Sequence, residues 1–72
     1  MIPKIGDVIK FRKNDGNIMV AMIGDYGRAN QKGLEQKTYK VNIPPQTDYR
    51  YNVFKDEVIE VLPQKDYPEY YL

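Results

Sequence analysis

Four residue types that supply much of protein chemistry are missing from this chain: cysteine, histidine, serine and tryptophan. Without cysteine there is no disulfide and no thiolate, so cysteine usage assigns no compartment. Without histidine the chain lacks the commonest general base and a common metal ligand. The remaining aliphatic hydroxyls, Thr38 and Thr47, have no histidine to activate them. We therefore expect no metal site, no cofactor and no covalent catalysis.

An excess of charge of one sign is also missing, because 11 basic residues face 10 acidic ones and leave a net charge of +1. A protein dedicated to duplex nucleic acid is usually much more basic. The acidic residues nearest in sequence are Asp56, Glu57 and Glu60. Adjacent side chains on a turn diverge, whereas glycoside hydrolysis needs two carboxyls facing one another across a cleft. We expect a protein that is not an enzyme, with a small hydrolase as the least favoured alternative.

Long apolar runs are the third absence. The longest, residues 18–23, is far shorter than the roughly 20 apolar residues that span a bilayer. Near the start of the chain Lys4 is followed by Ile5, Gly6 and Asp7, which do not form the apolar region of a signal peptide. The sequence predicts a soluble, cytoplasmic protein without a membrane partner.

The residues that are present alternate between apolar and polar, as expected for strands with one buried face. Seventy-two residues make one domain, and we expect strands over residues 8–12, 18–23, 37–43, 49–54 and 59–62. Asp15-Gly16 separates the first two and favours a hairpin turn. Residues 18–23 are apolar throughout, which fits a central strand covered on both faces. A short buried helix in a mixed α+β domain is the alternative.

The third and fourth strands predict which side chains face the core. The expected inward set is Tyr39, Val41 and Ile43, followed by Tyr49, Tyr51 and Val53, and the expected outward set is Thr38, Lys40 and Asn42. Residues 24–36 are polar and hold three glycines. They predict a long loop between the second and third strands, with a pair of twisted strand ends and a mobile tip as the other interpretation.

Two segments carry a resemblance to a known architecture. IGDVIKF (residues 5–11) and FKDEVIEV (residues 54–61) resemble the first and last strands of SH3-like small barrels, including KOW-type and Tudor-type members. In such barrels a 3₁₀ turn with an acidic residue precedes the closing strand, and Asp56 and Glu57 suit one exposed turn of this kind. With the strand pattern, the resemblance implies an all-β, five-stranded SH3-like small barrel. Either Ile59 and Val61 or Val58 and Leu62 would face its core.

The chain departs from each subtype of these barrels. It has no glycine in the middle of residues 18–23, unlike the usual KOW-type second strand, and it lacks the tryptophan of SH3 domains that bind proline-rich ligands. Its size and pattern resemble small phage and prophage proteins with this type of barrel. That resemblance implies a phage-type accessory factor or an inhibitor of a host protein.

The favoured function is a non-enzymatic protein-binding module. We divide the chain into a barrel domain, residues 1–63, and a tyrosine-rich tail, residues 64–72. The tail either folds back over an open end of the barrel or is exposed to a partner, because tyrosine is favoured at interface hot spots. The predicted partner-binding residues are Tyr26, Arg28, Lys32, Lys37, Lys40, Tyr67, Tyr70 and Tyr71.

The alternative function is nucleic-acid binding through the basic region 28–40. There the four cations named above face a single acidic residue, Glu35. Such side chains can contact phosphates while Tyr26 or Tyr39 stacks on unpaired bases. A solvated excursion whose charges only confer solubility would give the same pattern.

Overall fold

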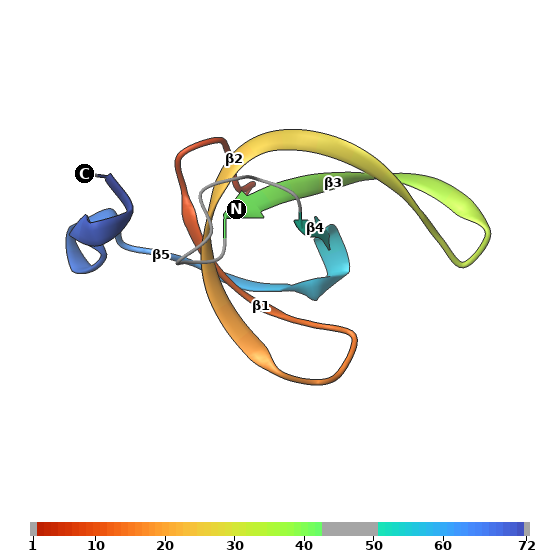
Figure 1. The fold of residues 1–72 in the computed structure, drawn as a ribbon, viewed down its shortest axis with the longest axis horizontal. Coiled ribbons are helices and arrows are strands. Elements are labelled where there is room, and N and C mark those ends of the chain that lie inside the picture. The colour runs from red at the N-terminus through yellow and green to blue at the C-terminus, as the bar shows by residue number, and fades with distance from the viewer. Residues whose placement is uncertain (1, 43–50, 72) are drawn as a thin grey trace.

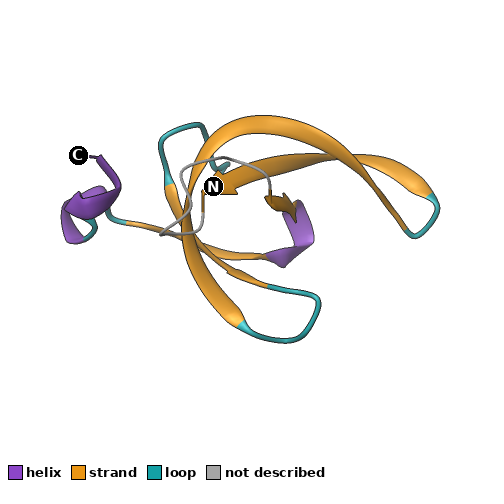
Figure 2. Ribbon diagram, viewed as in Figure 1, coloured by secondary structure: helices purple, strands orange, loops and turns teal. Residues whose placement is uncertain are grey.

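The computed structural model describes residues 2–42 and 51–71 (Figure 1). Five strands form one antiparallel sheet in the order β4-β3-β2-β1-β5. They are β1 (Val8–Arg12), β2 (Ile18–Gln31), β3 (Leu34–Asn42), β4 (Tyr51–Phe54) and β5 (Val58–Leu62). Three 3₁₀ turns are interspersed, η1 (Lys55–Glu57), η2 (Gln64–Asp66) and η3 (Pro68–Tyr71), and strands dominate the chain (Figure 2). The all-β prediction is confirmed, and the helical alternative for residues 18–23 is wrong.

Strand β2 is the longest element and holds the sheet together. Its first part pairs with β1 and the rest with β3, so the strand arches across the molecule (Figure 1). Ile23 is opposite Val41 and Asp25 is opposite Lys40, which leaves Gly24 as the extra residue of a β-bulge. The bulge shifts the alternation by one residue. Tyr26 therefore lies on the same face as Ile23.

The core occupies one face of this curved sheet. Its buried members come from the first four strands: Ile9, Phe11, Ala21, Ile23, Tyr39, Val41 and Val53. Met19, Tyr51, Val58 and Val61 pack against them. The inward positions predicted for Tyr39, Val41 and Val53 are confirmed, whereas Ile43 and Tyr49 lie outside the described residues. Burial of aromatic and branched side chains from several strands on one face is the main stabilising term.

Two details of burial differ from the sequence prediction. Thr38 projects from the face opposite the core, as expected, but it is only 2% exposed, and its hydroxyl donates a 2.7 Å hydrogen bond to Asn52 Oδ1. That bond offsets the cost of burying a polar group. Residues 18–23 are not covered on both faces along their whole length, since Ile18 at the start of β2 is 48% exposed.

The closing strand follows η1, which confirms the predicted 3₁₀ turn. Glu57 Oε1 accepts a 2.9 Å hydrogen bond from the backbone N–H of Phe54, which ties the turn to the end of β4. Lys10 is opposite Glu60 but Phe11 is opposite Val58, so Ile59 is the extra residue of a second bulge. Val58 and Val61 therefore contact the core while Ile59 points outward. Both predicted pairings of inward residues are wrong, because strict alternation does not include a bulge.

The predicted long loop between the second and third strands is wrong, whereas the other interpretation, a pair of strand ends, agrees with the extended β2 and β3. Residues 24–36 are almost entirely strand, and the chain reverses at Lys32 and Gly33 with φ angles of 55° and 79°. Positive φ at both positions is typical of a two-residue type I′ hairpin turn. We call residues 25–40 the hairpin arm. It extends from the rest of the molecule toward one end of the long axis (Figure 1).

Strands β4 and β5 lie at opposite edges of the sheet, and the described residues show no ladder between them. The structure therefore shows an open five-stranded antiparallel sheet and not a closed barrel. Within the described ranges, no helix has the length and apolarity needed to cross a membrane.

The C-terminal segment folds back against the sheet, at the opposite end of the long axis from the tip of the hairpin arm (Figure 1). Tyr70 Oη donates a 3.1 Å hydrogen bond to the Val20 carbonyl, and Gln64 Nε2 donates one of 3.3 Å to the Gly6 carbonyl. Val8 is fully buried although it is not part of the core cluster. We infer that the tail covers this outer side of β1. The division into residues 1–63 and 64–72 stays a prediction.

Replacing Tyr70 with phenylalanine removes the hydroxyl but keeps the ring. We expect Tyr70→Phe to lower the free energy of unfolding by about 0.5–1.5 kcal/mol, the usual net value of one hydrogen bond. Tyr67→Phe is the matched control, because the Tyr67 hydroxyl has no partner among the described residues. Urea unfolding measures both. Equal stability of the two variants would show that the tail bond contributes nothing.

Candidate functional site

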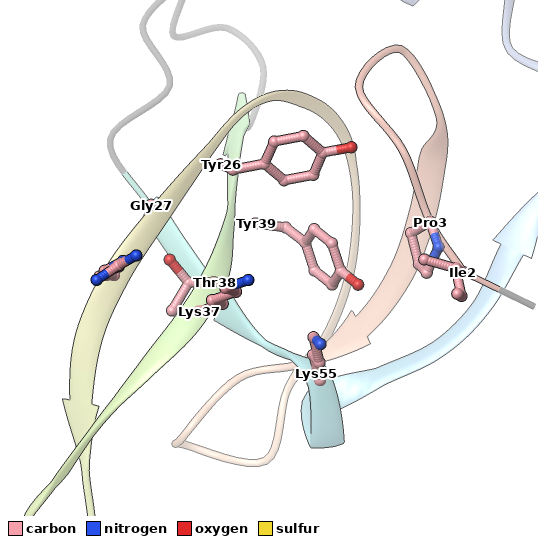
Figure 3. A pocket seen from close by; sticks show the side chains of 9 residues that line it. Ile2, Pro3, Tyr26, Gly27, Lys37, Thr38, Tyr39 and Lys55 are labelled. Carbon is pink, nitrogen blue, oxygen red and sulfur yellow. The ribbon is translucent and has the colours of Figure 1, made fainter.

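A cavity of about 460 Å³ opens at the base of the hairpin arm (Figure 3). Side chains from β2, β3, η1 and the N-terminal segment surround it: Ile2, Pro3, Tyr26, Gly27, Arg28, Lys37, Thr38, Tyr39 and Lys55. We call it the tyrosine pocket. The register of β2 and β3 explains the grouping, since Tyr26 is opposite Tyr39 and Arg28 is opposite Lys37. All four side chains therefore project from one face.

Two tyrosines form the aromatic wall of the pocket. Their ring centroids are 6.2 Å apart and the rings are tilted by 57°, a favourable arrangement for an aromatic pair. Tyr39 is only 5% exposed, whereas Tyr26 is 51% exposed. In Figure 3 both rings point toward the segment that holds Ile2 and Pro3. The Tyr26 ring thus packs against Tyr39 and remains open to solvent.

The polar side of the pocket is positively charged. Arg28, Lys37 and Lys55 line it, and none of the lining side chains within residues 2–42 and 51–71 is a carboxylate. Arg28 Nη1 lies 3.3 Å from Glu35 Oε1, but both side chains are more than half exposed, so this pair is weak. Lys37 and Lys55 form no ion pair within the described part of the chain. These two ammonium groups are therefore available to an anion.

Not all the cations predicted to act together share this pocket. Lys40 projects from the opposite face of β3, where its side chain lies over Gly27: a Cβ on that glycine would come within 2.7 Å of Lys40 Cε. Lys32 is in the turn at the tip of the arm. The structure brings together Tyr26, Arg28 and Lys37.

Tyr67 and Tyr70 of the tail are not among the residues that line the pocket. The rings of Tyr67 and Tyr70 are 6.3 Å apart, and Tyr70 is half-buried through its contact with β2. Tyr71 belongs to η3. The predicted partner-binding residues therefore fall into at least two separate places on the molecule.

Sequence reasoning missed three residues of the pocket. Lys55 was assigned only to a solvated turn, yet η1 places it beside Tyr39, 16 positions away in sequence. Ile2 and Pro3 carry no motif that the sequence analysis singled out. No local pattern marks these residues, because their role comes from long-range packing of the chain ends and η1 against β3.

The carboxylates near η1 do not converge. Asp56 accepts hydrogen bonds from Gln31 Nε2 at 3.3 and 3.4 Å, and Glu60 lies 3.7 Å from Lys10 Nζ. Glu57 bonds the backbone instead. Over residues 2–42 and 51–71, no three acidic side chains gather as a metal site would require.

The chain matches no protein-family model, no curated protein and no solved structure.

Burial raises the pKa of the Tyr39 phenol above its usual value near 10, and Tyr26 adds to the shift. The folded protein thus holds this proton more tightly than the unfolded chain. The resulting stabilisation is complete below about pH 10 and is lost as pH rises through the folded pKa. We expect the free energy of unfolding to fall between about pH 9 and pH 11, and to fall less in Tyr39→Phe. Urea unfolding at both pH values tests this. Equal losses in the two proteins would contradict it.

Proposed function

We propose that the protein is a non-enzymatic binding module whose ligand is single-stranded nucleic acid, held in the tyrosine pocket. The observation that carries the proposal is an exposed tyrosine face beside three cations, in a cavity whose described lining includes no carboxylate. Proteins that bind single strands combine aromatic stacking platforms with a positively charged groove. The tyrosine pocket offers both on one face of the hairpin arm.

The geometry favours unpaired over paired bases. Tyr26 and Tyr39 already contact one another in a tilted arrangement, so a base has no room between them and must stack on the open face of Tyr26. Such stacking requires a base whose face is free. A duplex hides these faces, and the net charge of +1 gives little general attraction to one.

We also propose that the strands have an SH3-like arrangement. The order β4-β3-β2-β1-β5, with a 3₁₀ turn between β4 and β5, supports an SH3-like arrangement whose edges remain open in the described residues. Strands β2 and β3 then supply the binding face and η1 supplies Lys55. The phage-type origin implied by the sequence resemblance has no further support.

Fluorescence anisotropy with a labelled oligothymidylate tests the proposed ligand. We expect binding at low salt that weakens as salt rises, because phosphate contacts release counterions. Tyr26→Ala should weaken binding by roughly 10-fold or more, since stacking contributes about 1–3 kcal/mol per base. Lys37→Gln should lower the slope of log affinity against log salt by about 0.7.

Lys40→Gln is the matched control for Lys37→Gln, because it also removes one positive charge from β3, but from the opposite face. It should leave affinity nearly unchanged. Equal effects of the two lysine variants would mean that binding is diffuse and does not use the pocket. No binding at low salt would reject the proposal.

A protein partner is the second candidate, favoured by a different feature. Strands β4 and β5 are each paired on one side only within the described ranges, and exposed edges can accept a strand from a partner. Leu34, near the tip of the hairpin arm, is 66% exposed and would add an apolar contact. The tail tyrosines belong to this candidate as well.

We expect a protein partner, if one is used, to be captured by the full chain and lost with Leu34→Asp. Pull-down followed by mass spectrometry compares that variant with Gln36→Asp, which adds the same charge at an exposed polar position of β3 two residues away without removing apolar surface. Identical captured proteins from wild type and both variants would exclude the tip. A variant lacking residues 64–72 tests the tail in the same way.

A further inference from the structure

The tyrosine pocket continues into a second cavity that nothing above has assigned. This cavity has a volume of about 380 Å³ and lies against β5. Its lining is Ile2, Pro3, Tyr39, Lys55, Val58, Ile59, Glu60 and Val61. Four of these residues, Ile2, Pro3, Tyr39 and Lys55, also line the tyrosine pocket. The two cavities therefore form one groove.

The two halves of the groove differ in chemistry. The tyrosine pocket contributes a stacking face and cations, whereas the second cavity is walled mainly by aliphatic side chains of β5 and the N-terminal segment. Glu60, the one carboxylate among its described lining residues, is 3.7 Å from Lys10 Nζ, which reduces its repulsion of an anionic ligand. Ile59 lines the second cavity but not the first. Its 46% exposure results from the bulge that places it on the outer side of β5.

Lys55 and Tyr39 lie where the halves meet. Figure 3 shows Lys55 on the side of the Tyr39 ring away from Tyr26, and both residues line each cavity together with Ile2 and Pro3. A ligand that enters both cavities must pass this ammonium group, which forms no ion pair with any described residue. The surfaces follow in the order Tyr26 ring, Lys55 ammonium group and aliphatic wall of β5. A ligand with two uncharged planar groups joined by an anionic linkage matches this order.

We propose that the groove holds two consecutive nucleotides of a single strand. One base stacks on Tyr26, the phosphate that joins the nucleotides contacts Lys55, and the second base or its sugar packs against Ile59 and Val61. This inference depends on the proposed function, because it specifies how much of a strand the same site contacts.

The first test compares two variants that add the same charge to exposed isoleucines. Ile59→Glu places a carboxylate in the second cavity, and Ile18→Glu places one at a position of similar exposure, 48% against 46%, that lines neither cavity. With a labelled hexathymidylate we expect Ile59→Glu to weaken binding at least 10-fold more than Ile18→Glu. Circular dichroism establishes that both variants are folded.

The second test addresses the joining phosphate. The dinucleotide TpT and its uncharged methylphosphonate analogue compete with the labelled hexamer for the wild-type protein and for Lys55→Gln. We expect TpT to compete better than its analogue with wild type, and this preference to disappear in Lys55→Gln. Lys65→Gln, in the tail, is the control and should keep the preference.

The outcomes separate the two proposals. If wild type does not bind the hexamer, both are overturned. If the hexamer binds but Ile59→Glu and Ile18→Glu weaken it equally, the second nucleotide site is wrong while the tyrosine pocket stands. A preference for TpT that survives in Lys55→Gln would remove Lys55 from contact with the joining phosphate.

Discussion

The structure depends on one extra residue in a strand. Gly24 has no partner on β3, and this single insertion changes which side chains of β2 face the core. Before Gly24 the inward residues include Ala21 and Ile23, and after it Tyr26 takes the same face. Regular alternation would place Tyr26 on the outer face, beyond reach of Tyr39. The core and the wall of the tyrosine pocket thus lie on one continuous face because of the bulge.

Sequence reasoning recovered the parts of the fold that follow from local chemistry. Alternating side chains located the strands, Asp15-Gly16 located the first hairpin, and the acidic KDE segment located η1. It did not recover the bulges at Gly24 and Ile59, because an insertion leaves no composition signal and only pairing across strands reveals it. The second hairpin was missed for a related reason. Lysine is an unusual residue at positive φ, so Lys32-Gly33 lacks the Asn-Gly or Asp-Gly signal of a type I′ turn.

The candidate site was only partly predictable. Tyr26, Arg28 and Lys37 were identified from their types, and cross-strand register brings them together. Lys40 is three residues from Lys37 yet lies on the other face of β3. Closeness in sequence therefore did not predict which cations lie close together in space. Nothing in the sequence indicated that Lys55 belongs to the site, because the position of η1 in the fold brings it to the pocket. A net charge near zero hides such a site, since it sums all acidic and basic residues regardless of their position.

The docking of the tail has a consequence for the mechanics of this small protein. Val8 is buried on the side of the sheet away from the main core. Tyr70 and Gln64 of the tail form hydrogen bonds to the backbone of the sheet and of the segment before β1. We infer that the tail covers the surface of the sheet opposite the main core, where Val8 is buried. Shortening the chain before η2 would then expose Val8 and its cross-strand partners Met22 and Leu62. Truncated forms should then self-associate even where their strands remain intact.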